Sequence, residues 1–135
     1  MYKRQVYLGT IPGKVGVVGP IVPIAFRFTD CKSVSSIQSI EFARDIGGYQ
    51  GSELGGPDKG FVSTDITKVR IFLWEDSVGS KKFRLKAFKP EESINSNAWV
   101  PVCYAQAGVV DVNGDGRPAP ARTFEGRAEF TVTYN

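Results

Sequence analysis

The clearest pattern in the sequence is a period-two alternation at its C-terminal end. From Phe124 to Tyr134 the apolar residues share one parity, and charged or hydroxyl residues share the other. Such alternation is typical of a strand that packs one face on a core and exposes the other to water. We therefore predict an amphipathic strand that begins near Phe124 and runs to the end of the chain.

Shorter segments of the same kind precede it. They are rich in Val, Ile, Phe and Tyr, and clusters of glycine, proline and polar residues separate them. Strands are expected around residues 6–8, 24–28, 37–42, 69–74, 83–87 and 99–108. In the last of these, Val100, Val102 and Tyr104 have the same parity and are expected on one face.

Two connections follow from the turn residues. The segment Ser77–Ser80 predicts a turn, so the strands on either side of it are expected to form a hairpin. The segment from Asp45 to Lys59 contains five glycines and a proline, and it predicts a long loop.

These elements indicate an all-β fold. About seven short strands with turn signals between them, and no amphipathic helix, are typical of an antiparallel β-sandwich. The length of 135 residues fits a single domain spanning 1–135. The sequence contains no apolar run of about 18 residues, the length a membrane-spanning helix needs.

The amino-acid composition excludes several kinds of catalysis and argues against nucleic-acid binding. The chain has no histidine, which excludes Ser-His-Asp and Cys-His catalysis and histidine-ligated metals. The net charge of +3 is small and dispersed, so it does not indicate nucleic-acid binding. The carboxylates Asp45, Glu53 and Asp58 lie in the predicted loop, where solvation is the ordinary role. We expect no enzyme activity, no cofactor and no metal.

One loop motif resembles a calcium-binding site. Residues 111–116 read D-V-N-G-D-G, which matches the start of an EF-hand calcium loop. The twelfth position of such a loop, however, is Arg122, where a bidentate glutamate is required. We therefore favour a turn in which Gly114 and Gly116 adopt positive φ.

The C-terminal strand raises a question about its neighbours. A long strand needs hydrogen-bonding partners on both edges, and a missing neighbour leaves unpaired backbone groups beside an apolar groove. Two alternatives are open at this point: the strand is the paired last strand of a closed sandwich, or it borders such a groove.

Several segments bear on this choice. They read V-Y-L-G-T, P-I-A-F-R-F-T-D-C, V-R-I-F-L-W-E-D, W-V-P-V-C-Y-A-Q-A-G and G-R-A-E-F-T-V-T-Y-N, and they begin at residues 6, 23, 69, 99 and 126. In this order they resemble segments of chaperone–usher pilus (fimbrial) subunits, which end with alternating apolar residues and a penultimate tyrosine, here Tyr134.

The resemblance implies a fold and a mechanism. Such subunits are incomplete immunoglobulin-like sandwiches whose final strand is missing. A periplasmic chaperone fills the groove first, and the donor strand of a neighbouring subunit replaces it after delivery to an outer-membrane usher. The protein would then pass through the periplasm to an extracellular fimbrium that adheres to a surface such as a host glycan.

The resemblance also assigns residues. The side chains expected to border the groove are those of Phe124, Ala128, Phe130, Val132 and Tyr134. Asn135 carries the terminal carboxylate, which in the family docks on the chaperone.

The chain departs from the family at its start. The family has a signal peptide, a donor extension and a cysteine before the first strand, and none of these is found here. We interpret residues 1–5 as a non-native leader on a reading frame truncated at its N-terminus. The cysteine that usually pairs with the equivalent of Cys31 is therefore missing. Cys31 and Cys103 either pair with each other or remain separate thiols.

Two other functions remain as alternatives. The chain could be the pilin half of a two-domain tip adhesin. It could also be a carbohydrate-binding β-sandwich that uses Trp74, Trp99 or Tyr49, provided that these aromatic rings are exposed on one face.

Overall fold

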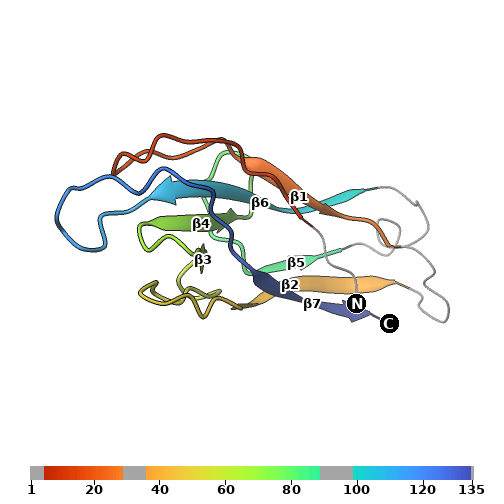
Figure 1. The fold of residues 1–135 in the computed structure, drawn as a ribbon. Helices are drawn as coiled ribbons and strands as arrows, with labels where there is room; N and C mark the ends of the chain where they lie inside the picture. Colours follow the sequence, from red (N-terminus) through yellow and green to blue (C-terminus); the bar gives the residue numbers. More distant parts are fainter. Residues whose placement is uncertain (1–4, 29–35, 89–98, 135) are drawn as a thin grey trace.

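A computed structural model describes residues 5–28, 36–88 and 99–134 (Figure 1). It contains seven strands, β1 (Val22–Phe26), β2 (Ile37–Asp45), β3 (Phe61–Ser63), β4 (Val69–Trp74), β5 (Leu85–Ala87), β6 (Val100–Val109) and β7 (Ala128–Tyr134). The described residues contain no helix, and therefore none long and apolar enough to cross a membrane.

The strands form two antiparallel sheets that face each other (Figure 1). One sheet has the order β1-β6-β4-β3, and the other has the order β5-β2-β7. The predicted all-β sandwich is therefore confirmed.

The core lies between the two sheets. Both sheets contribute side chains with almost no exposed surface, since alternate residues of each strand point inward. The largest fully buried apolar side chains are Phe42, Phe83, Ile40, Leu73 and Val102. A second, smaller cluster comprises Ile66, Val69, Val109 and Ala119.

A break in register within β6 changes which residues face this core. Ile24 of β1 lies opposite Cys103, whereas Ala25 lies opposite Pro101, so the pairing skips Val102. Such a bulge reverses the alternation of side chains. Val102 and Cys103 are consequently both buried, and Tyr104 is only half-buried. The prediction that Val100, Val102 and Tyr104 share a face was wrong for Tyr104.

The predicted hairpin around residues 77–80 is present only near its turn. The backbone N–H of Glu75 donates to the carbonyl of Lys81 (2.7 Å), and that of Phe83 donates to Leu73 (2.9 Å). Beyond Phe83 the chain crosses to the other sheet, where β5 pairs with β2. This crossing places the Phe83 ring in the core between the sheets.

The two ends also differ from the sequence prediction. Residues 6–8 form no strand, whereas the backbone of residues 16–19 pairs with the last residues of β6. The C-terminal strand begins at Ala128 and not at Phe124.

The long loop after β2 is confirmed, and a buried carboxylate organises it. Asp45 is 6% exposed, and it accepts hydrogen bonds from the backbone N–H groups of Gly47 (2.9 Å), Gly55 (2.7 Å) and Ser63 (2.7 Å). Gly55 lies so close to β3 that a Cβ atom there would be 2.0 Å from the carbonyl oxygen of Phe61. The loop is thus held against the start of β3.

Candidate functional site

Strand β7 lies at the edge of its sheet. It pairs with β2 along its whole length, from Asp45 opposite Ala128 to Ile37 opposite Tyr134. In the part of the chain that the structure describes, no strand lies along its other edge. An edge without a neighbouring strand can pair with a further strand.

The inward side chains of β7 are less covered than those of its neighbour. Val132 lies opposite Ile40, and Phe130 lies opposite Phe42. Both β2 side chains are 0% exposed, whereas both β7 side chains remain half-buried. Paired residues on one face of a sheet point into the same space. The difference therefore indicates that the core lacks cover beside β7.

Phe130 connects this edge to the opposite sheet. Its ring centroid lies 5.7 Å from that of Phe26 in β1, in an edge-to-face arrangement, and 5.9 Å from that of Phe42. Since β1 is the edge strand of its own sheet, this contact places both edge strands on the same side of the sandwich.

Half-buried apolar side chains lie on both of these edge strands and, for Phe28, just after β1. They pack on the central core, and all remain partly exposed. We call this surface the open seam; it comprises Ile24, Phe26, Phe28, Ala128, Phe130 and Val132. A seam of this kind presents apolar side chains and an unpaired strand edge together.

The other residues predicted for the groove lie in different settings. Phe124 precedes β7, is half-buried, and packs against both core clusters. Tyr134 ends β7 and is 61% exposed. Asn135 lies outside the described residues.

Cys103 is a free thiol at the centre of the core, with 0% exposure. Burial raises its pKa to about 12, and the charge of Lys86 opposes this only in part. Cys31, the other member of the possible pair, lies outside the described residues.

The aromatic side chains considered for sugar binding come from three different elements. Trp74 stacks on Phe72 with ring centroids 6.0 Å apart, and its indole N–H donates to Gln106. The hydroxyl of Tyr49 is buried, and of these three residues only Trp99 is among the exposed large side chains. They do not form one exposed aromatic face.

The loop carboxylates considered for catalysis are all engaged in local contacts. Asp45 accepts the three backbone hydrogen bonds described above, and Asp58 pairs with Arg84 (2.8 Å). Glu53 pairs with Lys59 (3.2 Å) and Arg70 (2.6 Å). The hydrogen bond from Lys59, together with the charges of Lys59 and Arg70, lowers the pKa of Glu53.

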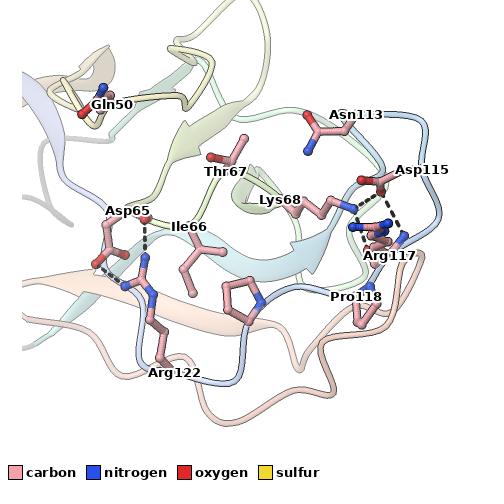
Figure 2. A pocket seen from close by; sticks show the side chains of 11 residues that line it. Gln50, Asp65, Ile66, Thr67, Lys68, Asn113, Asp115, Arg117, Pro118 and Arg122 are labelled. Carbon is pink, nitrogen blue, oxygen red and sulfur yellow. Dashed lines mark hydrogen bonds and ion pairs between the residues drawn. The ribbon is translucent and has the colours of Figure 1, made fainter.

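A separate hollow of about 460 Å³ lies beside the loop that joins β6 to β7 (Figure 2). Its walls come from residues 65–68, from this loop and from Gln50. Two ion pairs border it, one between Arg122 and Asp65 and one between Lys68 and Asp115.

The fold and this geometry define a class: a two-sheet antiparallel sandwich with an uncovered strand edge. Comparison with known proteins adds no narrower identity, since no family model, curated protein or solved structure matches the chain.

Proposed function

We propose that the chain is a structural subunit of an adhesive bacterial pilus, which polymerises when a strand of a neighbouring subunit inserts beside β7. The observation that carries the proposal is the unequal burial of paired residues, with Ile40 and Phe42 fully covered and Val132 and Phe130 half-buried. A strand added along β7 would cover these two side chains.

The open seam offers both interactions that strand addition needs. The free edge of β7 supplies backbone hydrogen bonds, and the apolar side chains of both sheets supply contacts for alternate residues of the incoming strand. Burying four or five apolar side chains of that strand would contribute on the order of 10 kcal/mol before ordering costs. An association of this strength suits a fibre that has to persist outside the cell.

The resemblance to chaperone–usher subunits supplies the rest of the proposal. The same seam would first hold a strand of a periplasmic chaperone, and the subunit would reach the fimbrium through an outer-membrane usher. In this account Phe124, Ala128, Phe130, Val132 and Tyr134 face or border the inserted strand, and Asn135 contacts the chaperone.

Thermal unfolding with a donor peptide tests the proposal. The peptide matches β7 in length, alternates valine with threonine, and has lysine at both ends for solubility. We expect it to raise the Tm of the protein by several degrees. A control peptide of identical composition, with its valines contiguous, should shift the Tm much less because only alternation puts all the apolar side chains on one face.

A matched pair of variants locates the binding. Val132→Lys places a charge in the open seam, whereas Thr133→Lys places the same charge on the exposed face of β7. The donor peptide should stabilise Thr133→Lys and wild type alike, and it should fail to stabilise Val132→Lys. No Tm shift in the wild type, or equal shifts in both variants, would refute the proposal.

A further inference from the structure

The loop that resembles a calcium site surrounds a cation that another part of the chain supplies. The ammonium group of Lys68, which precedes β4, bonds to the Asp115 carboxylate and lies 3.8 Å from Oδ1 of Asp111. It also donates to the carbonyl oxygen of Arg117 (2.6 Å), as Figure 2 shows. The Lys68 side chain is 8% exposed. Two carboxylates and a backbone carbonyl thus surround one buried positive charge.

The loop keeps a tight turn around this charge. The backbone N–H of Gly116 donates to the Asp111 carboxylate (3.2 Å), and that of Arg117 donates to Asp115 (3.0 Å). Gly114 and Gly116 have φ of 67° and 66°, as predicted for the turn. These contacts orient the two carboxylates toward Lys68.

The residue at the twelfth position of the motif points elsewhere. The guanidinium of Arg122 donates to the backbone carbonyl of Asp65 (2.7 Å) and pairs with its carboxylate (3.3 Å). It therefore provides none of the oxygen ligands that a calcium loop has at this position.

We infer that Lys68 supplies the cation of the 111–117 loop, so that this loop is held in place without calcium. The same residue also joins the loop to the sandwich through its backbone, because the N–H of Val110 donates to the carbonyl of Lys68 (2.7 Å). Lys68 thus connects the turn before β4 to the connection between β6 and β7. The inference does not depend on the proposed pilus function.

Thermal unfolding in calcium and in chelator tests this inference. Wild type should have the same Tm in millimolar CaCl₂ and in EGTA. Lys68→Met removes the charge but keeps the length of the side chain, so we expect its Tm in EGTA to fall by about 5 °C. Calcium should restore part of that loss, because two carboxylates and a carbonyl are left without a cation.

Two further variants serve as controls. Lys68→Arg keeps the charge and should have the same Tm in calcium and EGTA. Lys68→Met combined with Asp115→Asn removes a ligand and should lose the response to calcium. The inference is overturned if calcium raises the Tm of wild type, if Lys68→Met is as stable as wild type, or if calcium fails to restore it. If Lys68→Met does not fold, Asp115→Asn alone takes its place. Asp115→Asn should have a lower Tm than wild type, and an unchanged Tm refutes the inference.

Discussion

Replacing Phe130 by alanine is expected to destabilise the domain by about 2–4 kcal/mol, less than the same change at Phe42. A Phe→Ala substitution in a closed core costs about 3–5 kcal/mol, because contacts are lost and a cavity remains. Phe42 is 0% exposed and should show that full cost. Phe130 contacts the rings of Phe26, Phe42 and Phe83, yet it stays partly exposed, so somewhat less than that full cost applies.

Urea unfolding measures this difference directly. The free energy of unfolding in water and the slope m are obtained for wild type, both variants and Thr131→Ala, which lies on the exposed face of β7 and should change stability by less than about 0.5 kcal/mol. The slope should stay constant, so that the midpoints report stability alone. A loss at Phe130 equal to that at Phe42 would mean that Phe130 is fully covered, and it would refute the open seam.

Three further predictions concern Asp45, Gly55 and Cys103. Asp45→Ala leaves three backbone N–H groups without their acceptor, so it should lower the free energy of unfolding by about 3 kcal/mol or more. Urea unfolding measures this change, and a loss below about 1 kcal/mol would contradict the role of this carboxylate. Gly55→Ala places a Cβ atom against the carbonyl oxygen of Phe61 and should lower the Tm. Gly114→Ala meets nothing within 4 Å and is opposed only by its positive φ of 67°, so it should lower the Tm less; equal losses would contradict the close approach. For Cys103, whose pKa is raised from 9.0 to about 12, the unfolded chain loses its thiol proton first, so stability should fall as pH rises from about 9 toward 12. The difference in unfolding free energy between wild type and Cys103→Ala should shrink over that range, and a constant difference would argue against a buried thiol.

Much of the fold was predictable from alternation alone. The patterns around residues 24–28, 37–42, 69–74 and 99–108 each correspond to an observed strand, because apolar–polar alternation reports the two faces of a strand directly. The residues of the C-terminal strand were also predicted, although β7 begins four positions later than expected, at Ala128 and not Phe124.

Features that depend on pairing between distant segments could not be read from the sequence. The bulge at Val102 arises from how β6 pairs with β1. The local sequence pattern does not indicate that Tyr104 faces away from the core. The crossing after Phe83 is similar, because a hairpin turn does not reveal that the returning strand leaves the sheet.

Only the β7 wall of the candidate site was predicted from the sequence. The inward residues of β7 came from its alternation, but the opposing wall formed by Ile24, Phe26 and Phe28 requires knowing that β1 is the edge of the other sheet. The role of Lys68 was missed for the same reason, since it lies 47 residues from Asp115 in the sequence. The calcium-like motif was the one available signal, and it did not indicate which residue supplies the charge.

Amide hydrogen exchange on β7, followed residue by residue by NMR, tests the central claim most directly. With one edge paired to β2 and the other free, alternate amides of β7 should exchange rapidly while those between them are protected, and the donor peptide should protect the rapid set. Uniform protection of all β7 amides in the isolated protein, with no change on addition of the peptide, would show that the strand already has neighbours on both edges.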